Sequence, residues 1–191
     1  MELILASASP RRKEIIDMFN VTYNIKVPDV NEFIDCRFSP SVNAMHIAYL
    51  KAKDIVTHNK DSIVVSADTI VTIEDKIFGK PVDVNEAKEM LTQLSGKKHS
   101  VITGFCIVNY NKNIVYTDYI KTDVYFRELS NKQIIKYIET NEFKDKAGAY
   151  AIQGKAAIFI DKIEGDYFNV VGLPIAEINR VLIDFFSFNL I

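Results

Sequence analysis

The chain has 191 residues, of which 48% are hydrophobic, and its 23 basic and 25 acidic residues give a net charge of −2. This length can bury one substantial core, so we expect a single domain over residues 1–191, formed as one body or as two closely joined lobes. The balanced charge excludes the basic footprint of a protein that binds duplex nucleic acid, and no apolar stretch approaches the length of a membrane span.

The two cysteines, Cys36 and Cys106, lie far apart, and neither belongs to a Cys/His cluster with metal-ligand spacing. This pattern argues against a zinc site and against a disulfide framework. Positive charges follow the first apolar run instead of preceding it, which is the reverse of a secretory signal. We therefore expect a protein of the reducing cytoplasm.

The first third of the chain predicts strands that alternate with helices. Residues 3–6 form an apolar run typical of a buried strand, and Ser9 followed by Pro10 is typical of a helix start. A strand near 22–28 then leads through an acidic loop to a second Ser-Pro start, which predicts a helix over about 39–57.

The rest of the chain continues this mixture. The segment "SIVVSADTIVTI" is a β-branched run that predicts a strand interrupted by one carboxylate. The later elements are a helix from Asp83 to Leu94, long strands at 98–110 and 114–126, a helix from Ser130, strands near 157–163 and 167–171, and a helix from Pro174. Because the long central hairpin is antiparallel, the pattern predicts an α/β fold with a mixed sheet.

Two adjacent arginines, Arg11 and Arg12, stand at the start of the first expected helix. A helix N-terminus already carries positive potential, so cations there are unfavourable. Free backbone N–H groups together with two guanidinium groups would bind a phosphate or polyphosphate, and the anion would offset that cost. The alternative is an ordinary capped helix with solvent-exposed arginines.

Asp68 lies in the middle of the β-branched run. A carboxylate in such surroundings has to be paired, to bind a metal or to lie at an exposed strand end. It is either a structural aspartate that caps a turn or, opposite the arginines, a metal ligand or general base.

Three further positions are candidates for ligand contact. Lys51 lies at the border of the apolar stripe of its helix and Lys53 does not, so Lys51 is the better cleft-facing cation, unless it only covers the core edge. Lys80, in "FGKP", is a weaker signal. In "DKAGAYAIQG", glycines bracket Gln153, which indicates either close backbone approach to a ligand or a glycine-rich turn.

Taken in order, "LASASPRR", Lys51, "SADTIV", "GKP", "HSVITG", "DKAGAYAIQG" and "GDYFNVVGLPI" resemble the Maf family of nucleoside triphosphate pyrophosphatases over nearly the whole chain. The resemblance implies a single Maf-like domain with a mixed, curved sheet flanked by helices. It also implies two lobes and a nucleotide cleft, similar to inosine triphosphate pyrophosphatases. The implied reaction is hydrolysis between the α- and β-phosphates with a divalent cation, Mg²⁺ or Mn²⁺, and a homodimer is compatible with it.

The resemblance also implies roles for individual residues. Asp68 matches the proton acceptor that activates the attacking water, and Glu32 matches an acidic position near the metal, which Asp68 would share. The implied phosphate-binding residues are Ser9, Arg11, Arg12, Lys51 and Lys80. This set agrees with the requirements of phosphoryl-type displacement, namely a positioned water, a bridging cation and fixed positive charge.

The family divides into a branch acting on dTTP and UTP and a branch acting on 7-methyl-GTP. Arg11, Thr69 and Gln153 stand where the second branch tends to have an aromatic residue, Gln and Glu, respectively. An amide offers both donor and acceptor, which suits the O4 and N3–H edge of uracil or thymine. We expect a house-cleaning dTTP/UTP pyrophosphatase that also acts on modified pyrimidine nucleotides. A purine-directed pyrophosphatase and a non-catalytic nucleotide-binding regulator of cell division are the alternatives.

Overall fold

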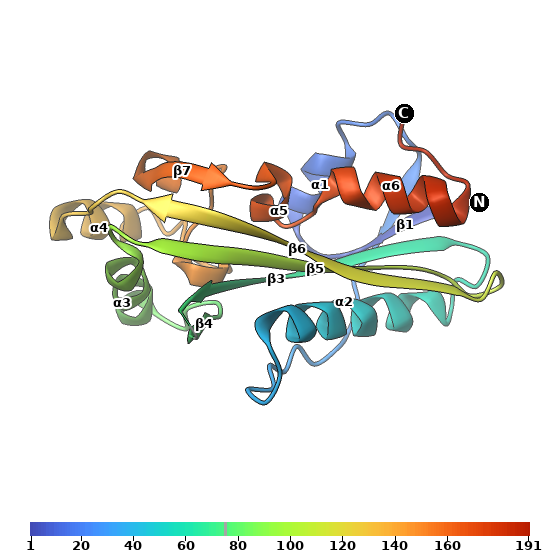
Figure 1. Ribbon diagram of the computed structural model, residues 1–191, viewed down its shortest axis with the longest axis horizontal. Coiled ribbons are helices and arrows are strands. Elements are labelled where there is room, and N and C mark those ends of the chain that lie inside the picture. Colours follow the sequence, from blue (N-terminus) through green and yellow to red (C-terminus); the bar gives the residue numbers. More distant parts are fainter. Residues whose placement is uncertain (75) are drawn as a thin grey trace. The chain divides into compact units, whose positions relative to one another are not determined.

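The computed structural model describes residues 1–74 and 76–191. Its elements are, in chain order, β1 (Leu3–Ala6), α1 (Pro10–Ile16), β2 (Tyr23–Lys26), α2 (Pro40–Val56), β3 (Ile63–Ile73), β4 (Lys76–Phe78), α3 (Val84–Leu94), β5 (Lys98–Asn109), β6 (Ile114–Phe126), α4 (Asn131–Ile138), the 3₁₀ turns η1 (Ala147–Ala149) and η2 (Lys155–Phe159), β7 (Ile160–Glu164), α5 (Tyr167–Val171) and α6 (Ile175–Phe186) (Figure 1). Helices and strands are interleaved, as the sequence predicts.

The strands form one mixed sheet in the order β2-β1-β3-β5-β6-β7, with β4 paired to β3. The β1 strand runs parallel to both β2 and β3, whereas β4 and β7 are antiparallel to their neighbours β3 and β6. The prediction of an α/β fold with a mixed sheet flanked by helices is therefore confirmed.

The chain divides into two compact units. Unit 1 comprises Met1–Asp68, Thr103–Ile120 and Gly172–Ile191, and unit 2 comprises Thr69–Ile102 and Lys121–Val171. The long strands β3, β5 and β6 each contribute residues to both units. The assignment of the whole chain to a single Maf-like domain stays a prediction.

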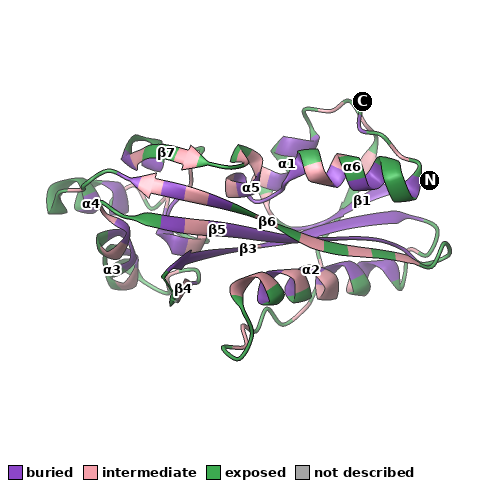
Figure 2. Cartoon of the chain, in the orientation of Figure 1, coloured by how far each residue is buried: buried purple, intermediate pink, exposed green. Residues whose placement is uncertain are grey.

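Unit 1 carries α2 on one face of its part of the sheet and α1 with α6 on the other (Figure 1). The α2 helix begins as the sequence predicts, because the Ser39 hydroxyl accepts a hydrogen bond from the Val42 amide at 3.3 Å and Pro40 takes the first helical position. Its inner face is buried and its outer face exposed (Figure 2). Small alanines on that inner face, Ala48 and Ala52, let the helix lie close to the strands.

One glycine sets how closely α2 approaches β5. A Cβ added at Gly104 would overlap the backbone of Ala44 and Met45 on α2. No side chain fits at this point, so the helix backbone rests directly on the strand. The sequence shows this glycine only within the weak motif "HSVITG".

Unit 2 is built around an aromatic core formed by Phe126, Tyr150, Phe159 and their apolar neighbours. Its helices start at the predicted caps: the Asp83 carboxylate accepts from the Glu86 amide at 2.8 Å, and Ser130 with Gln133 forms a capping box.

The β6 strand alternates between inward and outward residues, as its sequence predicts (Figure 2). Among the helices of residues 1–74 and 76–191, none combines the length and hydropathy of a membrane-spanning segment.

Two predictions near the C-terminus need correction. Residues 167–171 form the short helix α5 and not a strand, because the Asp166 carboxylate accepts a hydrogen bond from the Phe168 amide at 2.8 Å and starts a helical turn. Near the predicted strand at 157–163, the chain first makes the 3₁₀ turn η2 and enters β7 only at Ile160.

Candidate active site

The candidate site of unit 1 lies where β1 ends. The register pairs Ala6, the last residue of β1, with Ser66, so β3 continues past β1 and carries Asp68 two residues further. The carboxyl ends of parallel strands are where open α/β sheets bind ligands. The turn that follows β1 leads directly into α1 with its two arginines.

This turn is ordered by the buried hydroxyl of Ser7, which accepts a hydrogen bond from the Ser9 amide at 3.1 Å. Ser9 is the N-cap residue of α1 and Pro10 its first helical residue, as predicted. The Ser9 side chain makes no capping hydrogen bond with the helix, so its hydroxyl does not serve helix stability.

Arg12 is buried, with 9% of its surface exposed, and it joins three chain segments. Its Nε donates to the Gly172 carbonyl oxygen at 2.7 Å, and its Nη1 donates to the Ala67 carbonyl oxygen at 2.8 Å and to Ser7 Oγ at 3.4 Å. The alternative of two solvent-exposed arginines is therefore wrong for Arg12, whereas Arg11 is half-buried on α1. A guanidinium held in this way has a fixed orientation.

The charges around Arg12 act on its pKa in opposite directions. Burial lowers the pKa of Arg12 and nearby Arg11 adds to that effect, whereas the carboxylates of Asp68 and Glu32 raise it. Arginine is effectively never deprotonated in proteins, so the group remains a cation. Arg12 therefore interacts electrostatically with Arg11, Glu32 and Asp68.

Lys51 and Asp68 form a buried ion pair. Lys51 is 6% exposed and Asp68 9%, and Lys51 Nζ lies 2.8 Å from Asp68 Oδ1. The same ammonium lies 2.8 Å from Oε1 of Glu32, which comes from the loop between β2 and α2. Lys51 therefore does more than cover the core edge, and Lys53 is exposed, as predicted.

The carboxylates of Glu32 and Asp68 meet at the Lys51 ammonium. Hard carboxylate oxygens are the ligands that Mg²⁺ prefers, and such sites commonly use one or two carboxylates and complete their shell with water and substrate phosphate. In the part of the chain that the structure describes, no cluster of three or more His, Cys, Asp or Glu side chains could hold a metal. The two-carboxylate pair nevertheless fits a hard divalent cation by its chemistry.

The remaining predicted residues belong to unit 2. Thr69 follows Asp68 on β3 and is half-buried, while Lys80 and Gln153 are exposed on loops. The η1 turn, which precedes the turn of Gln153, bonds to the loop of Lys80, because the Gly148 amide donates to the Gly79 carbonyl oxygen at 3.1 Å. The roles of Thr69, Lys80 and Gln153 stay predictions.

The glycines around Gln153 serve packing. Gly148 has φ +68°, and a Cβ there would lie 3.0 Å from a methyl carbon of Val71, while a Cβ on Gly154 would overlap the Glu142 carboxylate. These contacts favour the interpretation as a glycine-rich turn for the two glycines themselves. They leave the role of the Gln153 side chain open.

Sequence reasoning missed the groups that hold Arg12. Ser7 follows a buried strand, a signal that could have been used, because a hydroxyl at a strand end often bonds to the turn that follows. Gly172 has φ +116°, and its place before Leu-Pro in "VVGLP" indicates a special backbone position. The Ala67 carbonyl gives no signal in the sequence at all.

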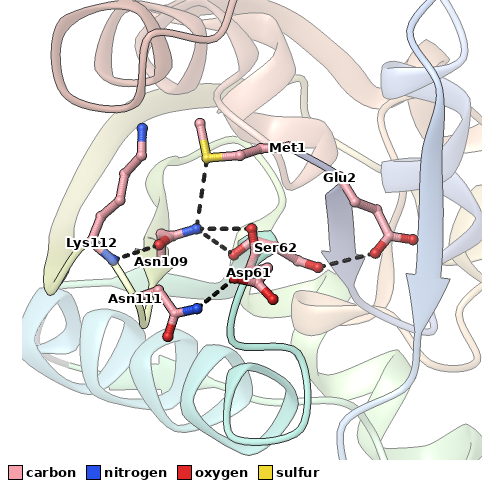
Figure 3. Close-up of a pocket in the computed structure, with 7 residues that line it drawn as sticks. All are labelled: Met1, Glu2, Asp61, Ser62, Asn109, Asn111 and Lys112. Carbon is pink, nitrogen blue, oxygen red and sulfur yellow. Dashed lines mark hydrogen bonds between the residues drawn. The ribbon is translucent and has the colours of Figure 1, made fainter.

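Unit 1 also has a polar pocket of about 300 Å³ (Figure 3). Met1 and Glu2 directly precede β1, and Asp61 and Ser62 directly precede β3, so the pocket lies at the strand ends opposite to the candidate site. It is lined by Met1, Glu2, Asp61, Ser62, Asn109, Asn111 and Lys112. Its polar groups bond to one another: Asn109 donates to the Ser62 carbonyl oxygen at 3.0 Å, and Ser62 donates to Glu2 at 3.0 Å. This pocket contains none of the predicted site residues.

Comparison with known proteins gives one family match and several full-length relatives. The model of the family described as "Maf-like protein" matches residues 2–185. A protein of Alkaliphilus oremlandii named dTTP/UTP pyrophosphatase is 49% identical over 191 residues, covering 100% of this chain and 99% of the relative. Proteins with the same name from Bacillus cereus and Clostridioides difficile are 47% and 43% identical, covering 96% and 100% of this chain and 95% and 98% of the relatives.

Proposed function

This chain belongs to the family of Maf-like proteins, and from that membership we propose that it is a dTTP/UTP pyrophosphatase. The reaction is hydrolysis between the α- and β-phosphates, with the nucleoside monophosphate and pyrophosphate as products. Full-length relatives of 43% to 49% identity that bear this name support the proposal. The structural observation that carries it is the buried Lys51–Asp68 pair beside Arg12 at the end of β1.

Asp68 is the general base in this proposal. A carboxylate at the end of a strand, held at 2.8 Å by the Lys51 ammonium, has a fixed direction in which to accept a proton from water. Water that has lost a proton to Asp68 attacks phosphorus, and pyrophosphate leaves. The burial of Asp68 and Lys51 keeps bulk water from competing for that carboxylate.

Positive charge from this chain stabilises the transition state. Phosphoryl-type displacement spreads negative charge over the phosphate oxygens, so fixed cations lower its barrier more than mobile ones do. We assign this task to Lys51 and Arg12 in unit 1 and to Lys80 in unit 2, with the Ser9 turn as a further phosphate contact. The three backbone and side-chain acceptors of Arg12 hold its guanidinium in place before substrate arrives.

We further propose that Glu32 and Asp68 hold Mg²⁺ or Mn²⁺. Such a cation supplies neutralisation of phosphate charge when it is bound. The loop that carries Glu32 is tied to the site by the 2.8 Å ion pair with Lys51, which already places the second carboxylate beside the first.

Base recognition is assigned to Gln153, with Thr69 and Arg11 as further specificity residues. The amide of Gln153 can donate to O4 and accept from N3–H of uracil or thymine, whereas a purine-directed site would gain more from a carboxylate. A pyrophosphatase for 7-methyl-GTP and a non-catalytic regulator are not favoured, because the relatives are named for dTTP and UTP.

The proposal extends to where and with what the protein works. Cys36 and Cys106 are both free, which supports a reducing cytoplasm. The partner is a nucleoside triphosphate, and a homodimer stays a prediction.

The test is release of pyrophosphate from a panel of nucleoside triphosphates. Purified protein is incubated with Mg²⁺ or Mn²⁺ and with dTTP, UTP, dCTP, dATP, dGTP or 7-methyl-GTP. We expect release to be fastest from dTTP and UTP and to require the metal. Faster turnover of 7-methyl-GTP would contradict the pyrimidine assignment, and no release from any nucleotide would contradict catalysis.

A further inference from the structure

A buried histidine in the core of unit 2 is not used by the reaction described above. His99 on β5 is 2% exposed and lies edge-on to the rings of Phe126 and Tyr150, with centroids 4.9 Å and 5.4 Å away. Its Nε2 is 2.7 Å from the Tyr150 hydroxyl oxygen. Within the described residues, its Nδ1 is buried without a hydrogen-bond partner. A buried polar atom without a partner is costly, so packing alone would favour phenylalanine here.

Tyr150, the hydrogen-bond partner of His99, directly precedes the turn that carries Gln153. Tyr150 is buried in the same core, and the chain leaves it to form a tight turn in which the Gly154 amide donates to the Ala151 carbonyl oxygen at 3.1 Å. Gln153 is exposed within this turn. The hydrogen bond to His99 therefore fixes the chain immediately before the exposed amide side chain.

A second anchor holds the other end of the turn. The Glu142 carboxylate accepts a hydrogen bond from the Lys155 amide at 3.0 Å and lies against Gly154, which has no Cβ to push it away. The other oxygen of Glu142 accepts from the Tyr137 hydroxyl at 3.4 Å. The turn of residues 151–154 is thus tied to the core on both sides, while its tip stays exposed.

We infer that His99 and Glu142 are positioning residues for base recognition, because together they fix the turn that presents Gln153 to the substrate. This inference rests on the proposed function and on the assignment of Gln153 within it. Neither residue touches the nucleotide. A turn held rigid before binding loses little conformational freedom when the base arrives, so its single amide discriminates more sharply between bases.

The experiment measures kcat and KM of the full-length protein for dTTP and for dCTP, whose base presents the opposite hydrogen-bonding edge. The variants are Tyr150→Phe, which keeps the ring and removes the hydroxyl, and His99→Phe. We expect each to raise KM for dTTP about fivefold, to leave kcat within about twofold, and to lower the preference for dTTP by a similar factor, as suits one lost hydrogen bond. The double variant should lose no more of the preference for dTTP than the more affected single variant, because both substitutions remove the same hydrogen bond between His99 and Tyr150.

Two further variants separate positioning from stability. Glu142→Ala should lower the preference for dTTP, and Glu142→Gln, which keeps an oxygen for the Lys155 amide, should restore it. Ile134→Val removes one methylene from the same core cluster and should lower the melting temperature without changing the preference. The Glu142 pair also decides the matter if the His99 and Tyr150 variants fail to fold.

The outcomes distinguish this inference from the function on which it rests. If Gln153→Ala lowers the preference for dTTP but Tyr150→Phe, His99→Phe and Glu142→Ala do not, the positioning role is wrong and the pyrophosphatase assignment stands. If Gln153→Ala leaves the preference unchanged, the turn does not read the base and the inference is overturned. If the wild-type protein releases no pyrophosphate from either nucleotide, the proposed function fails and the inference fails with it.

Discussion

The two units hold their candidate site residues with different kinds of buried group. In unit 1 the buried groups are charged, with Lys51 between two carboxylates and Arg12 on backbone carbonyls. In unit 2 the buried anchors are the neutral ring of His99 and the hydroxyl of Tyr150. Buried charges are costly unless they are paired or bind an oppositely charged group. The buried charges of unit 1 fit the phosphate-binding role that we propose for Arg12 and Lys51, and the neutral anchors of unit 2 fit the base-reading role that we propose for Gln153.

The largest expected effect comes from the proposed base in unit 1. Asp68→Asn keeps the shape of the side chain but removes its capacity to accept a proton, so we expect kcat for dTTP to fall about 10³-fold. Pyrophosphate release measures it, and circular dichroism checks folding. The matched control is Asp61→Asn in the polar pocket, which should retain full activity. A fall of less than tenfold for Asp68→Asn would remove Asp68 from catalysis.

The next effect tests whether the charges of unit 1 also hold its fold. Arg12→Ala leaves the carbonyl groups of Ala67 and Gly172 without the buried guanidinium that donates to them, and it removes one cation near the Asp68 carboxylate, where Lys51 remains. We expect a loss of about 3–5 kcal/mol in the free energy of unfolding, measured by urea denaturation. Arg11→Ala, at a half-buried position, should cost less than about 1 kcal/mol. Equal losses would mean that the buried contacts of Arg12 contribute nothing.

A third effect tests the neutral anchor of unit 2 through pH. Burial lowers the pKa of His99 from about 6.5 to about 4, against a smaller opposing effect of Asp123. The unfolded state then binds more protons than the folded state between these values, so stability falls as pH falls from 6.5 to 4, by up to about 3 kcal/mol. His99→Phe should remove this part of the pH dependence in denaturation curves. An unchanged slope would mean that His99 is protonated in the folded protein at pH 5.

The smallest effect separates the two arginines by function. Arg12→Ala should lower kcat/KM by a similar factor for all nucleotides. Arg11→Ala should instead change the ratio of kcat/KM between dTTP and 7-methyl-GTP by about threefold to tenfold. The comparison needs both variants at saturating metal. If Arg11→Ala and Arg12→Ala reduce every substrate by the same factor, the pair is a plain phosphate clamp.

Local signals in the sequence were sufficient for most of the fold. Caps at Ser39, Asp83 and Ser130 start helices where predicted, since side-chain capping depends only on residues within one turn. The aromatic and β-branched segment 167–171 was mistaken for a strand, because its helical turn depends on the carboxylate of Asp166 just before it. Propensity alone could not show that capping would prevail over a β-like composition.

The candidate site was predictable in its residue types but not in its contacts. Helical periodicity separated Lys51 from Lys53, and the β-branched surroundings singled out Asp68. The sequence could not show that Arg12 would be buried, because two of its three acceptors are backbone carbonyls that lie 55 and 160 positions away. Long-range hydrogen bonds to the main chain leave no pattern of residue types.

The contact between Gly104 and α2 limits which residues position 104 can accept. The backbone of α2 at Ala44 and Met45 packs against Gly104, and Lys51 lies about two turns after Ala44 in the same helix. A methyl group added at Gly104 would push the N-terminal part of α2 away from β5. This shift would move the Lys51 ammonium away from Asp68 although no charged residue is changed. The distance between Lys51 and Asp68 therefore depends in part on a position that has no side chain.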